Sequence, residues 1–220
     1  MIQIYRLSKS FGTNIALDDI GLRIRKGEFI FITGPSGAGK TTLLRHIFGT
    51  EKPTSGQILI DGINLTRIRR HKLDLLRRKI GFVFQDFKLL NNKTVYQNVA
   101  LALEVTGERQ AIIRKKVHQA LRSVDLSKKE KAFPLEVSGG EQQRIAIARA
   151  IINDPMILIA DEPTGNLDPD ITKDIMILFR SINLRGTTVV IATHSKELLR
   201  DTGHRIIVLN QGRIVEEIKG

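Results

Sequence analysis

The sequence predicts an α/β protein built on a mostly parallel β-sheet, and three observations support this prediction. Short runs rich in Val, Ile and Leu recur along the chain, and several are apolar at every position, as in strands covered on both faces. Helical stretches separate these runs. A glycine-rich loop joins the apolar run at 29–33 to a helical pattern that starts at Leu43. The other runs lie at 57–60, 80–84, 156–160, 187–193 and 205–209.

The loop at 34–41 reads Gly-Pro-Ser-Gly-Ala-Gly-Lys-Thr, a complete pattern for binding nucleotide phosphates. Its glycines allow several backbone N–H groups to approach the phosphates without Cβ clashes. Lys40 would reach the outer phosphates, Thr41 would offer a hydroxyl to Mg²⁺, and the positive end of the following helix would face the anion. A glycine-rich turn without a ligand is the alternative, but the strand before it and the helix after it favour a nucleotide. The expected contacts are Gly34, Pro35, Ser36, Gly37, Ala38, Gly39, Lys40, Thr41 and Thr42.

Composition narrows the class of protein. At 220 residues the chain can bury one substantial core, with at most a subdomain added. No apolar run approaches the roughly 18 residues of a membrane span, and the first residues lack the basic-then-apolar order of a secretion signal, so we expect a cytoplasmic protein. The chain has no cysteine, which excludes disulfides and thiolate chemistry.

The net charge of +12 and the pI near 10.2 indicate an acidic partner. Nucleotide, nucleic acid and the anionic inner face of a membrane are the candidates. The densest basic stretch, 67–79, interleaves Arg and Lys with leucines at 73, 75 and 76. We interpret it as an amphipathic helix with the leucines turned inward, and contact with an anionic membrane surface is the alternative.

The two ends of the chain differ in character from its middle. The first 30 residues are rich in strand-forming runs. The runs 205–209 and 213–218 flank Asn210-Gln211-Gly212, as in a hairpin with a three-residue loop. Between Gln85 and Asn153 apolar residues recur at helical spacing, which predicts a helical insertion in a sheet-based domain.

Two carboxylates, Asp161 and Glu162, follow the apolar run 156–160. Strand ends in open α/β sheets are where ligands bind. Asp161 would hold Mg²⁺ through its water shell, and Glu162 would polarise a water for in-line attack on the γ-phosphate. An acidic pair in a polar loop is the alternative, and the phosphate-binding loop upstream favours the catalytic interpretation.

A second short motif, Ser138-Gly139-Gly140-Glu141, precedes the apolar-periodic stretch 145–152. Ser138 and Glu141 have the spacing of a capping box at a helix start. Each glycine weakens a helix by up to about 1 kcal/mol relative to alanine, so two in succession need a reason. Bare N–H groups that face a second anion would be one.

Taken in order along the chain, four segments resemble the ATPase subunits of ABC transporters: 34–42, 137–144, 158–168 and 192–194. The resemblance spans essentially the whole chain, and the serine-glycine-glycine signature separates this family from other P-loop NTPases. It implies a RecA-like P-loop NTPase core with a mostly parallel sheet, an N-terminal antiparallel β subdomain and a helical subdomain insertion.

The same resemblance implies a single domain over 1–220. Residues 1–85 and 154–220 would form the nucleotide-binding core with the β subdomain, and 86–153 would form the helical subdomain that carries the signature. Val137 stands where the family more often has Leu, and Phe11 stands where it more often has the Tyr that stacks under adenine. A core phenylalanine is the alternative for Phe11, and neither departure puts ATP binding in doubt.

The resemblance further implies a head-to-tail dimer that sandwiches two ATP molecules, with the loop 34–42 of one subunit facing residues 138–141 of the other. Gln85 would contact Mg²⁺ and the attacking water and sense a membrane partner, and His194 would contact the γ-phosphate. Asp168 matches an acidic residue of the loop between the two sites, although Asp168-Pro169 also fits a helix N-cap and its next residue. The expected catalytic residues are Glu162, His194, Gln85 and Lys40, and the expected metal ligands are Thr41, Gln85 and Asp161.

Within the family, the segments 84–90, 94–100 and 160–168 resemble the subunits that act in bacterial cell division. Subunits of lipoprotein-release and macrolide-export systems are also similar. The first resemblance implies an integral membrane partner, control of peptidoglycan hydrolases outside the cell, and a peripheral location on the inner face of the cell membrane.

Residues 86–100 would then line the groove that receives a short cytoplasmic helix of this partner. The expected apolar anchors are Phe87, Leu89, Leu90 and Tyr96. Ordinary packing within the helical subdomain is the alternative explanation for these side chains.

Two other functions are compatible with some of these features. The net charge of +12 would suit a nucleic-acid-binding ABC ATPase, but such proteins pair two ATPase modules or insert a long coiled coil, and 220 residues accommodate neither. The third hypothesis is a nucleotide-gated scaffold, in which hydrolysis serves only as a slow reset. We therefore expect an ATP hydrolase that drives a membrane partner, with no nucleic acid bound.

Overall fold

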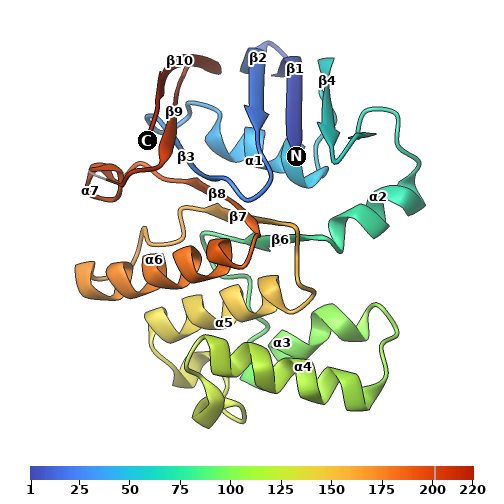
Figure 1. Cartoon of the computed structure of the whole chain (residues 1–220), viewed down its shortest axis with the longest axis vertical. Helices are drawn as coiled ribbons and strands as arrows, with labels where there is room; N and C mark the ends of the chain where they lie inside the picture. The colour runs from blue at the N-terminus through green and yellow to red at the C-terminus, as the bar shows by residue number, and fades with distance from the viewer. Residues whose placement is uncertain (201) are drawn as a thin grey trace.

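The computed structural model describes residues 1–200 and 202–220, which fold around two β-sheets (Figure 1). The larger sheet has six strands in the order β10-β9-β3-β8-β7-β6, and every neighbouring pair except β9 with β10 is parallel. The predicted mostly parallel sheet is confirmed. The strand bounds are Phe29–Thr33 (β3), Ile80–Val83 (β6), Ile157–Asp161 (β7), Thr188–Ala192 (β8), Arg205–Asn210 (β9) and Arg213–Ile218 (β10).

The central strands of this sheet are apolar on both faces because a separate core lies on each side. In β7, Leu158 and Ala160 pack into the core formed with the helices drawn in the lower half of Figure 1. Ile157 and Ile159 alternate with them and pack into the core beneath the smaller sheet. This alternation explains why the apolar runs of the sequence have no polar face.

The smaller sheet is antiparallel and has the order β2-β1-β4-β5. It is the expected N-terminal β portion, extended by a strand pair from later in the chain. The bounds are Ile2–Phe11 (β1), Asn14–Ile24 (β2), Ser55–Ile60 (β4) and Ile63–Asn64 (β5). Helix α1, Lys40–Phe48, lies between the two sheets and buries Leu43, Leu44 and Ile47 in the core that they share.

Three helices lie in the chain between β6 and β7, where the sequence predicted a helical insertion. They are α3, Val95–Glu104, α4, Gln110–Ser123, and α5, Gly139–Ile151, with short 3₁₀ turns at Ser127–Lys129 and Pro134–Glu136. Helix α5 packs on α3, α4 and β6, and so joins this group to the larger sheet. Helices α6, Pro169–Leu184, and α7, Lys196–Leu199, follow β7 and β8. Within the described residues, no helix has the length and apolar character needed to span a membrane.

The C-terminal hairpin is confirmed, but its predicted three-residue loop is wrong. Strand β9 continues to Asn210, which pairs with Arg213, so only Gln211 and Gly212 form the turn. Both have positive φ, 47° for Gln211 and 77° for Gly212, as in the type I′ turn that suits the twist of a two-residue hairpin.

The basic stretch forms helix α2, Arg70–Arg77, but the prediction that all three leucines turn inward is wrong. Leu76 is buried and Leu73 is half-buried, whereas the Leu75 residue is 54% exposed. Residues three apart share a helix face, and Leu75 is rotated about 100° from Leu76. In a helix of eight residues that packs on one side, a leucine at this position points to solvent.

Candidate active site

A cleft of about 640 Å³ lies at the carboxyl ends of the parallel strands, where ligands bind in open α/β sheets. It brings together many of the residues that the sequence predicted. These are Phe11, Pro35, Ser36, Gly37, Ala38, Gly39, Lys40, Thr41, Thr42, Gln85, Glu162 and His194. The hairpin between β1 and β2 adds Asn14, Ile15 and Ala16, which the sequence analysis missed. The one feature of the sequence that could have indicated these cleft residues was the apolar Ile15, four residues after Phe11.

The loop between β3 and α1 needs glycine for reasons that the structure makes specific. Gly34, Gly37 and Gly39 have φ of 145°, 78° and 102°. A Cβ on Gly34 would lie 2.0 Å from the carbonyl oxygen of Leu209, and one on Gly39 would lie 2.5 Å from that of Ala16. Neighbouring backbone therefore excludes side chains at both positions before any phosphate arrives, while Gly37 is required by its conformation alone.

Lys40 is the first residue of α1, and its side chain folds back over this loop. Its Nζ donates to the carbonyl oxygens of Gly34 at 2.8 Å and Pro35 at 3.1 Å. Nζ also lies 3.8 Å from Oε1 of Glu162. Both residues are buried, so the cleft contains a desolvated ammonium paired with a carboxylate.

Asp161 is the last residue of β7, so it lies inside the strand rather than after it. Burial raises the pKa of its carboxyl group, while the hydroxyl of Thr41 acts in the opposite direction. Its Oδ1 is buried and has no hydrogen-bond partner among the described residues. A buried carboxylate oxygen without a donor, beside a hydroxyl, fits the oxygen ligand set of Mg²⁺.

Glu162 directly follows β7 and has φ of +47°, which is uncommon for a residue other than glycine. Its backbone N–H donates to Ala192 at the end of β8. Its Oε1 lies 2.9 Å from Nδ1 of His194, and its Oε2 accepts from the backbone N–H of His194 at 3.3 Å. These contacts tie the ends of two parallel strands together and fix both carboxylate oxygens at the edge of the cleft.

Gln85 and Phe11 lie at the rim of the cleft. Gln85 is exposed and follows β6, two residues after Val83. Phe11 is 47% exposed, which rules out its interpretation as a core residue. The Nζ of Lys9 lies over the Phe11 ring, 4.6 Å from its centre.

The signature residues lie away from this cleft, at the start of α5. The predicted capping box is confirmed: Ser138 Oγ accepts from the N–H of Glu141, and Glu141 Oε2 accepts from the N–H of Ser138. A Cβ on Gly140 would lie 2.7 Å from Cγ2 of Ile171 in α6, so any larger residue would force Ile171 to shift. A Cβ on Gly139 would meet only Leu167, at an ordinary 3.8 Å. Contacts among the described residues therefore do not explain the absence of a side chain at Gly139.

Asp168 is the N-cap residue of α6, and Pro169 follows at the first helical position as predicted. The Asp168 side chain makes no capping hydrogen bond. The local helix therefore does not use the Asp168 carboxylate, and Asp168 does not line the cleft.

Comparison with known proteins identifies relatives over nearly the full length. A model of the ABC transporter family matches residues 17–165. The Bacillus subtilis (strain 168) cell division ATP-binding protein FtsE is 49% identical over 218 residues, which cover 99% of this chain and 96% of that protein. The Mycobacterium tuberculosis FtsE is 48% identical over 219 residues, with 99% and 95% covered. The Escherichia coli (strain K12) FtsE is 44% identical over 215 residues, with 97% of each chain covered.

Two solved structures of an ATP-binding cassette, MJ0796, have the same fold. One is a dimeric post-hydrolysis state bound to ADP and Pi, with a TM-score of 0.90 and 38% identity. The other is a dimeric structure described as a bacterial ABC transporter cassette, with a TM-score of 0.91 and 39% identity. Each alignment covers 100% of this chain and 98% of the other.

Proposed function

The chain belongs to the ABC transporter ATPase family and hydrolyses ATP, and we propose that it works as the FtsE-type ATPase subunit of a membrane complex in bacterial cell division. The FtsE-type role is supported by the identity of 44–49% to FtsE proteins over nearly the full length. The observation that carries the ATPase chemistry is the carboxylate of Glu162, buried beside the loop 34–42. It lies 3.8 Å from the Lys40 ammonium and 2.9 Å from the His194 imidazole. A base, a cation and a hydrogen-bonding ring thus meet where the outer phosphate of a bound nucleotide would lie.

The triphosphate would lie along the loop 34–42, with its outer phosphates against the N-terminus of α1. Lys40 already donates to two loop carbonyls, and it would give up part of this bonding to reach a phosphate oxygen. Thr41, Gln85 and Asp161 would hold Mg²⁺, which when bound neutralises charge on the β- and γ-phosphates. The exposed ring of Phe11 would stack under the adenine.

Hydrolysis is attack of water on the γ-phosphorus with cleavage of its bond to the bridging oxygen, giving ADP and phosphate. Glu162 would accept a hydrogen bond from this water and orient it in line with the breaking bond. The contacts of both Glu162 oxygens to His194 hold the carboxylate in one orientation. His194, whose side chain is 66% exposed, would donate to the γ-phosphate from the open side of the cleft.

The Glu162→Gln variant tests this assignment. We expect ATP turnover to fall by a factor of about 10² to 10⁴, because the amide cannot act as a base. ATP binding should persist, since the loop 34–42 is unchanged. Glu216→Gln is the matched control, because Glu216 is an exposed residue of β10 that does not line the cleft. Turnover that survives in Glu162→Gln would mean that another group activates the water.

We propose that the active form is a head-to-tail dimer with two ATP molecules at its interface. The exposed Ser138 and Gly139 lie outside the cleft of their own chain, and the unfilled space at Gly139 suits the close approach of a second chain's nucleotide. The solved MJ0796 cassettes of the same fold are dimeric, which supports this arrangement. Sedimentation of the Glu162→Gln variant with ATP, with ADP and without nucleotide measures it, and dimers are expected with ATP alone.

The proposed partner is an integral membrane protein of the FtsX type that docks on residues 86–100. Phe87, Leu89 and Tyr96 are partly buried against the helical core, so packing within the chain accounts for them. Leu90 is 40% exposed and is the remaining apolar anchor. Through this partner, ATP-driven closure would control peptidoglycan hydrolases outside the cell, with the subunit held on the inner face of the cell membrane.

A lipoprotein-release or macrolide-export complex is the alternative setting for the same ATPase. Depletion of the protein distinguishes the two settings. Filamentous cells that fail to divide would support the FtsE-type role, whereas retained lipoproteins or increased macrolide sensitivity with normal division would support the alternative.

A further inference from the structure

The segment around α2 carries charge that the fold does not use. Residues 67–79 contain seven Arg and Lys side chains and one carboxylate, Asp74. Asp74 pairs with Arg77, which also donates to the carbonyl oxygen of Gly49. The other six basic side chains are exposed and have no ion pair or side-chain hydrogen bond within residues 1–200 and 202–220. These six are Arg67, Arg69, Arg70, Lys72, Arg78 and Lys79.

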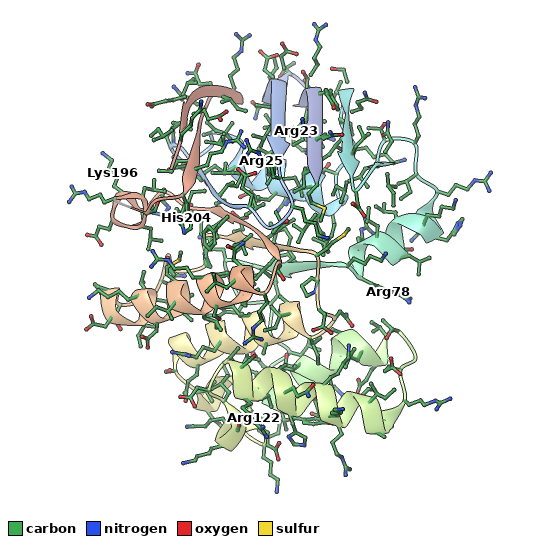
Figure 2. All side chains as sticks on the ribbon, in the orientation of Figure 1. Arg23, Arg25, Arg78, Arg122, Lys196 and His204 are labelled. Carbon is green, nitrogen blue, oxygen red and sulfur yellow. The ribbon has the colours of Figure 1, made fainter. Side chains whose placement is uncertain are left out.

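An exposed apolar side chain lies in the middle of this charge. Leu75 is 54% exposed. Lys72 and Arg78 lie three residues before and after it on the same face of the helix. Figure 2 shows the labelled Arg78 pointing away from the body of the molecule, and Figure 1 shows α2 projecting beside the two sheets. We call Leu75 and the six basic residues the α2 surface.

We propose that the α2 surface binds the anionic headgroups of the membrane bilayer, with Leu75 entering the boundary between headgroups and acyl chains. This inference rests on the proposed function, because the membrane partner brings the chain to the bilayer. Clustered Arg and Lys around an aliphatic side chain suit an anionic interface. Strand β6 also joins α2 directly to Gln85 and the proposed docking segment 86–100, so both contacts would lie along one continuous stretch of chain.

Nucleic acid is a weaker match to the same surface. Proteins that bind single strands combine basic residues with aromatic rings on which bases stack. Residues 67–79 contain no Phe, Tyr or Trp, and their exposed apolar group is aliphatic. An aliphatic group without a hydrogen-bond donor favours lipid over bases.

Vesicle co-sedimentation of the purified chain tests the proposal. We expect binding to vesicles of phosphatidylglycerol and phosphatidylcholine, little binding to phosphatidylcholine alone, and a steep loss as salt rises. A triple variant, Arg69→Gln, Arg70→Gln and Lys72→Gln, should lose tenfold or more of this binding. The control is Arg114→Gln, Lys115→Gln and Arg122→Gln, which removes the same charge from the exposed side of α4 (Figure 2 labels Arg122). Leu75→Gln should weaken binding severalfold with no change in charge.

Three outcomes would overturn the proposal: equal loss in both triple variants, equal binding to neutral vesicles, or tighter binding of the α2 surface to single-stranded DNA than to anionic vesicles. Because the six basic residues lack contacts, the α2 triple variant should keep its thermal stability, and Leu75→Gln provides a test if it does not. The Glu162→Gln turnover assay tests the proposed function separately, so either idea can fail alone.

A second, independent observation concerns the turn that follows Gln85. Phe87 and Lys88 are consecutive residues with φ of 57° and 50°. Left-handed conformation at two neighbouring residues other than glycine persists only when surrounding contacts hold it. The guanidinium of Arg149, near the end of α5, donates to the carbonyl oxygen of Phe87 at 2.6 Å and to that of Lys88 at 2.7 Å.

We infer that Arg149 is a positioning residue that holds this turn and so sets the orientation of Gln85 in the cleft. Arg149 lies on α5, the helix that Ser138 caps. Helix α5 would therefore connect the signature, which faces the second subunit of the proposed dimer, to Gln85 of the same chain. Arg149 is half-buried, and its guanidinium donates to two backbone carbonyls, which indicates a specific role rather than a solvated charge.

The Arg149→Lys variant tests this role, because an ammonium cannot reproduce two parallel N–H bonds. We expect kcat to fall about tenfold to a hundredfold while the Kd for ATP stays within twofold. Adding Lys88→Gly, which relieves the left-handed strain, should restore part of the lost kcat. The control is Arg77→Lys in α2, whose guanidinium donates to the carbonyl oxygen of Gly49 and pairs with Asp74.

The inference fails if Arg149→Lys keeps normal kcat, if ATP affinity falls as much as kcat, or if Lys88→Gly restores nothing. An equal loss of kcat in Arg77→Lys would also overturn it, because the effect would then follow from the loss of any arginine–carbonyl bond.

Discussion

Two adjacent carboxylates at the end of β7 have different surroundings, and this difference supports the separate roles proposed for them. Glu162 is paired with Lys40 and His194. Asp161 has a buried oxygen with no partner in the described part of the chain, and burial raises its pKa. Neighbouring acids held in unlike environments are the usual means by which one site separates its roles. Asp161 is thus suited to a cation and Glu162 to water.

Because one oxygen of Asp161 is buried without a partner among the described residues, replacing this residue should raise stability and weaken Mg²⁺-dependent binding. Asp161→Asn removes a charge that burial disfavours, so the nucleotide-free chain should unfold at a temperature a few degrees higher, a gain of about 1 kcal/mol. Binding of ATP in the presence of Mg²⁺ should weaken at least tenfold, because an amide is a poor ligand for Mg²⁺. Calorimetry measures both quantities. A variant that loses stability would mean that Asp161 is charged and well paired in the fold.

A buried histidine predicts how stability depends on pH. His46 of α1 has no exposed surface; its Nδ1 lies 2.8 Å from the carbonyl oxygen of Thr42, and its Nε2 has no partner in the described residues. Burial lowers its pKa below the ordinary 6.5; nearby Lys9 also lowers it, while Glu51 and backbone carbonyls raise it. A depressed histidine pKa favours the neutral form in the fold. The contribution of neutral His46 to the free energy of unfolding is therefore fully present above pH 6.5. This contribution is lost as the pH falls from 6.5 through the folded pKa.

The His46→Gln variant removes this titration and isolates its effect. Below pH 6.5 the free energy of unfolding of the normal chain should fall relative to the variant by up to about 1.4 kcal/mol per pH unit. Urea unfolding at a series of pH values measures the difference. Parallel curves for the two proteins would show that His46 does not titrate on unfolding in this range.

At the scale of elements, the start of α5 separates two glycines that look equivalent in the sequence. A Cβ on Gly140 would press against Ile171, so Gly140→Ala should destabilise the chain by about 1–3 kcal/mol through overpacking. Gly139→Ala meets only ordinary contact and replaces a poor helix former, so the monomer should be at least as stable as before. Urea unfolding of the two variants measures this contrast.

The same pair tests the proposed dimer. In the Glu162→Gln background, the Gly139→Ala change should weaken ATP-dependent dimerisation at least tenfold, because its methyl group would occupy space meant for the opposing nucleotide. Dimers of normal affinity with Gly139→Ala would contradict the proposed interface.

The elements differ in how far the sequence could predict them. The parallel strands and the capping box at Ser138 follow from short-range patterns, and the structure contains both. The loop of the C-terminal hairpin was wrong by one residue, because Asn210 is equally acceptable in a turn and at a strand end. The packing of Gly140 against α6 could not be predicted, because it depends on contact between two helices that are separate in the sequence.

Side chains that bond to backbone carbonyls are the other class that the sequence could not predict. Arg149 reaches a turn 61 residues earlier in the chain. The buried Asn98 likewise holds the loop that precedes α3, because its side chain donates to the carbonyl oxygens of Leu90 and Lys93. A carbonyl acceptor is present at every residue, so such bonds have no sequence signature. The catalytic candidates were easier to predict because phosphate chemistry restricts their types and spacing.

For the whole molecule, the net charge of +12 affects assembly as well as partners. Two copies of a strongly basic chain repel each other, and the bound nucleotides offset only part of that repulsion. The Debye length shortens from about 30 Å at 0.01 M salt to about 10 Å at 0.1 M. Added salt should therefore screen the repulsion between charges on the two subunits.

We therefore predict that the ATP-bound Glu162→Gln dimer becomes severalfold tighter as salt rises over this range, while binding of the α2 surface to anionic vesicles weakens. Analytical ultracentrifugation at several salt concentrations measures the first effect, and vesicle co-sedimentation under the same conditions measures the second. The α4 triple variant, Arg114→Gln with Lys115→Gln and Arg122→Gln, is the matched control, because its lower net charge should flatten the salt dependence of the dimer. A dimer that dissociates as salt rises would mean that complementary charges at the interface outweigh the net charge of the two chains.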